Sequence, residues 1–190
     1  MAYTAKDFSN LIGMEGFSEA LLKNHFTLYQ GYVNNVNRLV TTLAGKAPDG
    51  TNPEYAELKR RFGFEFDGMK LHELYFGNLG GKATLNKGGS LGSALAKAFG
   101  SYENWEKDFK ATGMMRGIGW VILYQDSESG VLYNAWINEH HVNILAGCTP
   151  LLVMDVWEHA FMLDYGTRKM DYIEAFFKNV KWDVVASRLR

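Results

Sequence analysis

The stretch that decides the fold runs from Pro150 to Ala160 and reads PLLVMDVWEHA. Its first half is a short apolar run, which predicts a buried strand that ends at Asp155. An ionised carboxylate in such a place costs on the order of several kcal/mol unless it is paired or bound to a metal. His159 follows four residues later, a spacing that can bring both side chains to one point where a strand turns into a helix. A helix-capping aspartate with an incidental histidine would not explain the apolar context, so we interpret the pair as half of a metal site.

Two further histidines lie far away in the N-terminal part of the chain. Apolar residues recur every three or four positions over residues 17–45 and again from about 54 to 79, which predicts two long amphipathic helices. A turn-forming segment with two prolines separates them and makes them an antiparallel hairpin, and we expect a break or bend near Gly63. His25 and His72 lie on the two apolar stripes. One such histidine is usually a core residue, but two on adjacent helices can point into a shared volume.

The rest of the chain predicts an α/β lobe. Residues 82–90 form a connection rich in glycine, asparagine and lysine. The predicted elements beyond it are helices at 91–99 and 102–112 and strands at 120–124, 131–137 and 150–155. The expected fold class is therefore α+β, with an N-terminal antiparallel helical hairpin domain (1–82) and a C-terminal α/β domain (91–190) that contains a three-stranded antiparallel sheet.

The composition argues against several classes of partner and of metal site. The formal net charge is −1, which gives no electrostatic case for a nucleic-acid or anionic-membrane partner. No window approaches the roughly 18–20 apolar residues of a membrane span, and the first residues show no charged region followed by an apolar run. Cys148 is the only cysteine, so the sequence has no intrachain disulfide or thiolate cluster. We expect a cytoplasmic protein whose metal ligands are histidines and oxygen donors.

His25, His72, Asp155 and His159 together offer three imidazoles and one carboxylate. This donor set suits iron, manganese or zinc. Iron and manganese can change oxidation state, whereas Zn²⁺ cannot.

The stretch Asp155–Ala160 resembles the signature of the iron/manganese superoxide dismutases, and similar likeness extends over nearly the whole chain. The segments that carry it are Tyr165–Trp182, Tyr32–Asn37 and Gly117–Trp120. The resemblance implies the fold described above, with one metal ion between the hairpin and the α/β lobe. Its four ligands would be His25, His72, Asp155 and His159.

The resemblance also implies an activity. Iron or manganese would cycle between +3 and +2 and convert two superoxide anions and protons to dioxygen and hydrogen peroxide. Trp120 and Trp157 match aromatic positions around the family's metal, although core packing alone would explain both tryptophans equally well. Phe76 stands where a tryptophan is usual. Family members with glycine two residues before the aspartate tend towards manganese, and those with bulkier residues tend towards iron. Val153 occupies that position, so iron is favoured and manganese stays open.

The sequence departs from the family at the glutamine that hydrogen-bonds the metal's solvent ligand. The position on the second helix is Gly68, and the loop after the second strand has no glutamine. A count without gaps places His141 at the sheet position, with His140 one residue away, and we infer that one of them replaces the glutamine. Such an imidazole would titrate near neutrality. Tyr32 resembles the tyrosine that gates substrate entry, seven rather than eight residues after His25.

The resemblance further implies a homodimer, with a tetramer also possible. Glu158 would cross the interface and hydrogen-bond His159 of the partner subunit. A second family contact joins a histidine and a tyrosine across the interface. Here both positions have changed, to Tyr29 and Met162, so that contact is expected to be absent or rewired.

Two other functions compete with this interpretation. One is an iron protein on the same scaffold that consumes peroxide or oxygen, which the replaced glutamine keeps open. The other is a non-enzymatic interaction module, which would be expected to lose metal ligands that this sequence retains.

Overall fold

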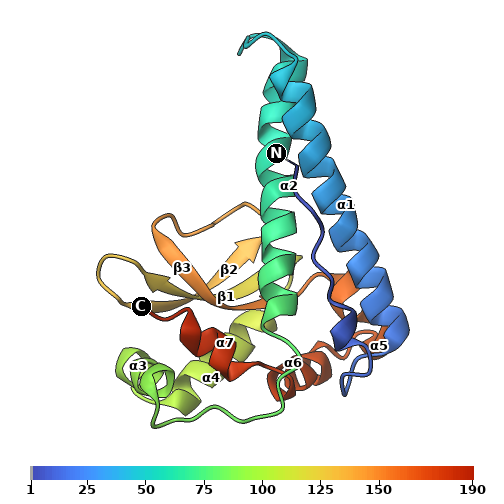
Figure 1. Cartoon of the computed structure of the whole chain (residues 1–190). Helices are drawn as coiled ribbons and strands as arrows, with labels where there is room; N and C mark the ends of the chain where they lie inside the picture. The colour runs from blue at the N-terminus through green and yellow to red at the C-terminus, as the bar shows by residue number, and fades with distance from the viewer. Residues whose placement is uncertain (1) are drawn as a thin grey trace.

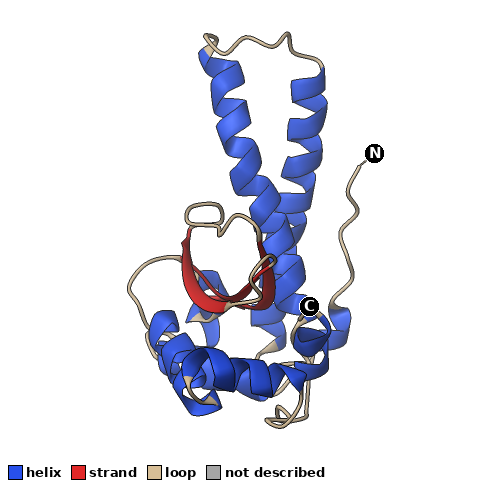
Figure 2. Ribbon diagram, turned by 90° about the vertical axis from the view of Figure 1, so that its left-hand side faces the viewer, coloured by secondary structure: helices blue, strands red, loops and turns tan. Residues whose placement is uncertain are grey.

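The computed structural model describes residues 2–190 (Figure 1), so Met1, the first residue of the predicted hairpin domain, lies outside the described residues. Its first large feature is an antiparallel hairpin of two long helices, α1 (Glu19–Ala44) and α2 (Pro53–Gly77). A short 3-10 turn, η1 (Ser9–Leu11), precedes them. Figures 1 and 2 show the hairpin projecting well beyond a body made of a small sheet and the shorter helices.

Each hairpin helix begins at a capping side chain. The Ser18 hydroxyl accepts a hydrogen bond from the Leu21 amide, and the Asn52 side chain accepts from the amides of Glu54 and Tyr55. Because the first turn of a helix leaves its N–H groups without partners, such caps fix where α1 and α2 start.

The expected break near Gly63 is wrong, because α2 is helical without interruption from Pro53 to Gly77. A glycine inside a helix costs only about 1 kcal/mol relative to alanine. The packing of α2 along α1 outweighs that cost, since most helical stability in a protein comes from tertiary contacts.

The C-terminal part follows the expected order of elements. Two helices, α3 (Ser90–Phe99) and α4 (Tyr102–Gly113), lead to three antiparallel strands in the order β2-β1-β3. Their bounds are Gly119–Asp126 for β1, Leu132–Asn138 for β2 and Cys148–Asp155 for β3. The last elements are η2 (Glu158–Ala160), α5 (Met162–Tyr165), α6 (Lys169–Lys178) and α7 (Trp182–Ser187). The fold class predicted from the sequence is confirmed.

The central strand β1 is buried along almost its whole length, and β3 is buried over its second half. The sheet packs against the lower half of α2 and against the shorter helices (Figure 2). The buried end of β3 therefore lies beside the hairpin, where the two parts of the chain meet. Among residues 2–190, no helix combines the length and the apolar character that crossing a membrane requires.

Candidate metal centre

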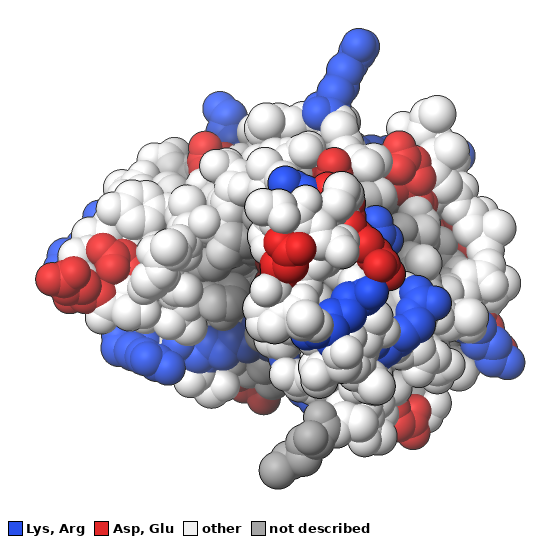
Figure 3. Space-filling model, turned by 90° about the horizontal axis from the view of Figure 1, so that it is seen from above, with Lys and Arg blue, Asp and Glu red and all other residues white. Residues whose placement is uncertain are grey.

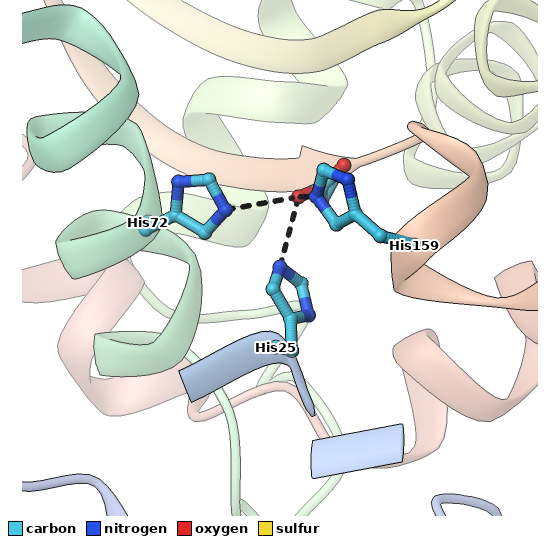
Figure 4. A group of neighbouring side chains, drawn as sticks. His25, His72 and His159 are labelled. Atoms are coloured by element: carbon cyan, nitrogen blue, oxygen red, sulfur yellow. Dashed lines mark hydrogen bonds and ion pairs between the residues drawn. The ribbon is translucent and has the colours of Figure 1, made fainter. Parts of the chain in front are cut away.

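Four side chains from four separate elements converge where the hairpin meets the sheet (Figure 4). His25 comes from α1, His72 from α2, Asp155 from the end of β3 and His159 from η2. Their nearest ligand atoms all lie within 4.8 Å of one another. The structure therefore brings together the four residues that the sequence singled out as metal ligands.

The Asp155 carboxylate lies at the middle of the cluster and is fully buried. Its Oδ2 atom is 3.1 Å from His25 Nε2, 3.0 Å from His159 Nε2 and 3.7 Å from His72 Nε2. Its Oδ1 atom accepts a hydrogen bond of 2.8 Å from the Trp157 amide, which anchors the carboxylate. The three imidazoles thus present the same ring nitrogen to one oxygen atom.

His72 presents a free lone pair to this cluster. Its Nδ1 donates a hydrogen bond of 2.6 Å to the Gly68 carbonyl, which leaves Nε2 without a proton. Nε2 is fully buried and has no hydrogen-bond partner in the described part of the chain. An unsatisfied buried polar atom costs about 1–3 kcal/mol. A cation bound at this point would satisfy it, so the cluster fits a metal ion on its own geometry.

Electrostatics agree with that fit. Burial lowers the pKa of both His25 and His72, so their imidazoles are neutral and can act as ligands. Burial alone would raise the pKa of Asp155, but the charge of His159 and hydrogen bonds from His159 and His25 hold it well below its usual range. The cluster therefore offers a metal three nitrogen atoms and one anionic oxygen. His25, His72 and Asp155 are buried, and His159 is partly exposed.

Comparison with known proteins decides the family. A family model described as iron/manganese superoxide dismutases, C-terminal domain, matches residues 87–188. An iron superoxide dismutase of Cupriavidus metallidurans is 37% identical over 180 residues, covering 92% of this chain and 89% of its own. The chain belongs to the iron/manganese superoxide dismutase family.

Other relatives in the superoxide dismutase family carry either metal in their names. An iron superoxide dismutase of Aquifex pyrophilus is 36% identical, with coverage of 96% of this chain and 89% of its own. A manganese superoxide dismutase of Haloferax volcanii is also 36% identical, with coverage of 90% and 85%. The family resemblance inferred from the sequence is thereby confirmed, and both metals are represented among its relatives.

Aromatic rings surround the cluster at the positions that the family pattern predicts. The Trp120 ring meets His72 edge-on at 5.0 Å, and the Phe76 ring meets His25 at 4.8 Å. The Trp157 ring stacks on His159 at 5.8 Å. Trp120 and Phe76 are fully buried, so these rings exclude water from the ligands.

The structure places His140, and not His141, beside the cluster. His140 is fully buried and its ring centre lies 6.0 Å from that of His72, whereas His141 is exposed. His140 Nδ1 accepts a hydrogen bond of 3.0 Å from Trp120 Nε1, and His140 Nε2 lies 2.6 Å from Tyr32 Oη. Counting back from Asp155 without gaps selected His141, which is one residue away from the inward-facing His140.

The Trp120 contact assigns the tautomer of His140. An indole N–H can only donate, so Nδ1 of His140 accepts and Nε2 carries the proton. Nε2–H then donates to Tyr32 Oη, and the tyrosine keeps its own proton for another acceptor. Burial raises the pKa of Tyr32, so its hydroxyl stays protonated near neutral pH.

The expectation that this histidine titrates near neutrality is not supported. Burial lowers the pKa of His140 to about 4. A protonated His140 would also direct its Nδ1–H at the N–H of Trp120. His140 is therefore a neutral hydrogen-bond donor over the physiological range, as an amide would be.

Two positions that shape the site were not singled out as site residues. A Cβ atom on Gly68 would lie 2.7 Å from the Tyr32 ring, so glycine is what lets the ring pack on α2. Glu139 has a left-handed backbone, with a φ of 52°, directly before His140. Its amide donates to the Ile118 carbonyl and its carbonyl accepts from Trp157 Nε1. Nothing in the sequence NEHH marks this turn, which directs His140 inwards.

We predict that Gly68→Ala displaces Tyr32. The added methyl group would overlap the ring, and such overpacking costs about 1–3 kcal/mol. Gly63→Ala is the matched control on the same helix, since a Cβ there meets no atom within 4 Å. It should stabilise the protein by about 0.5–1 kcal/mol. Urea unfolding measures both, and equal effects at the two positions would contradict the close packing.

We also predict a pH signature for His140. In the unfolded chain its pKa returns to about 6.5, so between pH 6.5 and 4 the unfolded state binds more protons than the folded state. The free energy of unfolding is therefore unaffected by this group above pH 6.5, and it falls by up to about 1.4 kcal/mol per pH unit from pH 6.5 towards pH 4. The free energy of unfolding, measured by urea titration at each pH, should depend less on pH for His140→Gln than for wild type. Parallel pH dependences would contradict the lowered pKa.

Proposed function

We propose that this protein is a superoxide dismutase, which converts two superoxide anions and protons to dioxygen and hydrogen peroxide. One iron or manganese ion per subunit would be held by His25, His72, Asp155 and His159. The observation that carries the proposal is the convergence of three imidazole nitrogens on one buried carboxylate, with the lone pair of His72 otherwise unused. When bound, the metal supplies one-electron chemistry by changing between its +3 and +2 states.

The protein's own residues would control protons and water. Tyr32 is buried enough to remain protonated, and its oxygen already accepts from His140, so its O–H is available to a substrate or solvent oxygen in the site. Trp120 fixes His140 as the donor. We propose that Tyr32 and His140 together position one of the two protons that the reduction of a superoxide anion to hydrogen peroxide takes up. The rings of Trp120, Trp157 and Phe76 keep the rest of the site dry.

Long-range attraction of the superoxide anion is expected to be weak. The formal net charge is −1, and acidic and basic side chains are both spread over the face in Figure 3. Any steering must come from charges near the entrance. Arg61 is the candidate nearest His140: its guanidinium lies 4.2 Å from the Phe64 ring, and that ring also contacts His140 at 4.6 Å. Its charge is partly offset by an ion pair with Glu65 at 2.6 Å.

We favour iron over manganese, on the sequence argument from Val153 alone. The four ligands serve both metals equally well. The relatives named above include enzymes of both kinds, so their names do not separate the two metals.

The decisive test uses two preparations, one loaded only with iron and one only with manganese, each assayed for superoxide removal. At least one should be active, with iron the more active.

His72→Ala should lower metal affinity more than about 100-fold, because removal of even a residue that merely orients a ligand costs about 10–100-fold. His141→Ala is the exposed control and should behave as wild type. If both fully loaded preparations leave superoxide untouched, a peroxide- or oxygen-consuming iron protein becomes the better assignment. A native protein without stoichiometric metal would favour the interaction module.

We further propose a homodimer in which Glu158 binds His159 of the partner subunit. Metal-bound histidines nearly always donate their second N–H to an acceptor. Within residues 2–190, Nδ1 of His159 has no hydrogen-bond partner, and the side chain is 25% exposed. Glu158 is exposed beside it, and Met162 and Leu163 leave an apolar surface nearby, 45% and 58% exposed.

The contacts of Tyr29 support the expectation that the family's second contact across the dimer is absent or rewired. Tyr29 Oη is already engaged inside the subunit, since it donates to Glu73 Oε1 at 3.2 Å and accepts from the Lys6 amide at 3.0 Å. Burial raises its pKa to about 12. The Tyr29 hydroxyl thus has both a donor and an acceptor partner within its own subunit.

Sedimentation tests the dimer. Wild type should sediment at twice the subunit mass, or four times if a tetramer forms. Glu158→Ala should weaken self-association by about tenfold or more, because truncating one member of a buried charged hydrogen bond costs about 2–5 kcal/mol. Glu128→Ala, in the exposed turn between β1 and β2, is the control for loss of one carboxylate. A monomeric wild type, or equal effects of both variants, would contradict the proposal.

Two smaller proposals rest on the sequence. The division into domains at 1–82 and 91–190 is supported by the family match, which begins at residue 87 in the connection. A cytoplasmic location is supported by the single cysteine alone.

A further inference from the structure

The end of α2 is attached to β3 through one side chain, Asn78. This residue follows the last helical residue and is fully buried. Its Oδ1 accepts a hydrogen bond of 3.0 Å from the Val153 amide, and its Nδ2 donates to the Val153 carbonyl at 3.2 Å. Nδ2 also donates to the Tyr75 carbonyl at 2.9 Å, within α2 itself. The amide therefore pairs with the open edge of β3 as a neighbouring strand would.

A second side chain, Arg188, joins the same two elements from the C-terminal part of the chain. Its Nη1 donates to the Leu151 carbonyl on β3 at 2.7 Å, and its Nη2 donates to the Leu74 carbonyl on α2 at 3.3 Å. Nη1 also lies 3.4 Å from Asn78 Oδ1. Among residues 2–190, no carboxylate pairs with this guanidinium. Its charge is balanced by backbone carbonyls, including those at the negative C-terminal end of α2.

The backbone around these side chains reinforces the junction. The Lys181 amide donates to the Asn78 carbonyl at 2.9 Å, and the Gly81 amide donates to the Asn179 carbonyl at 2.8 Å. A Cβ atom on Gly81 would lie 2.2 Å from the Val180 carbonyl oxygen, so only glycine permits this approach. The segment between α6 and α7 is thereby held against the end of α2.

This junction lies very close to two of the four candidate ligands along the chain. Leu74, which accepts from Arg188, comes two residues after His72 on α2. Val153, which pairs with Asn78, comes two residues before Asp155 on β3. A sliding of α2 along β3 would therefore change the distance of 3.7 Å between His72 Nε2 and Asp155 Oδ2 directly. No direct hydrogen bond joins His72 to Asp155 in the described residues, so something else must set that distance.

We propose that Asn78 and Arg188 are positioning residues of the metal centre, which fix the separation of His72 from Asp155 by locking α2 to the edge of β3. The proposal rests on the proposed metal-binding function. The two residues touch neither the ligands nor the substrate. Their role is to hold two rigid elements at the spacing that a bound ion requires, since a metal site tolerates errors of only about 0.5 Å.

The test compares Arg188→Gln with Arg190→Gln, both in the iron-loaded protein. The two changes remove the same charge two residues apart, but the Arg190 side chain is exposed and only its backbone bonds to Gln125. Arg188→Gln should release iron to a chelator about tenfold faster and alter the electron paramagnetic resonance spectrum of ferric iron, recorded frozen from a fully folded sample. Arg190→Gln should match wild type in both measurements.

The result that overturns the proposal is a lowered melting temperature of Arg188→Gln with an unchanged spectrum and unchanged iron release, because that describes stability alone. If Arg188→Gln fails to fold, Arg188→Lys decides by the same two measurements. It keeps the charge but has no planar fork to reach both carbonyls, so iron release faster than wild type supports the proposal and a wild-type rate overturns it. Failure of the proposed function is seen separately, as wild type that binds no stoichiometric iron.

Discussion

The Asp155 carboxylate carries negative charge where almost no water reaches, and the rest of the centre is arranged around that charge. Three imidazole nitrogens lie 3.0 to 3.7 Å from its Oδ2 atom, and the Trp157 amide binds its other oxygen. Such a group is stable only when opposite charge or donors surround it. The hairpin supplies two of the nitrogens and η2 supplies the third, so the hairpin and the C-terminal lobe must pack correctly to stabilise this one side chain.

Much of this arrangement was predictable from the sequence, for physical reasons. His25 and His72 lie on apolar stripes of long helices, where periodicity is the strongest signal of structure, and Asp155 ends an apolar strand. The expected break at Gly63 is wrong because packing along α1 outweighs one unfavourable helix propensity. Counting residues could not decide between His140 and His141. The left-handed backbone at Glu139 directs His140 inwards, and a glutamate does not predict such a turn.

The proposed replacement of the family's glutamine by His140 depends on shape as well as on chemistry. Gly68 leaves room on α2 for the Tyr32 ring, and His140 reaches the same ring from the loop after β2. Trp120 sets the imidazole as a neutral donor, and burial keeps it so down to a pKa of about 4. A histidine can therefore behave as a fixed amide does, provided that a donor-only neighbour occupies its other nitrogen.

The capping of the β3 edge has a consequence for biosynthesis. All four candidate ligands precede Arg188 in the chain, so they leave the ribosome before the residue that covers the Leu151 carbonyl. A chain without residue 188 offers part of that edge as free backbone groups to neighbouring chains, which is the usual starting point for misassembly. Loss of the last few residues would therefore be expected to raise the fraction of newly made protein that aggregates.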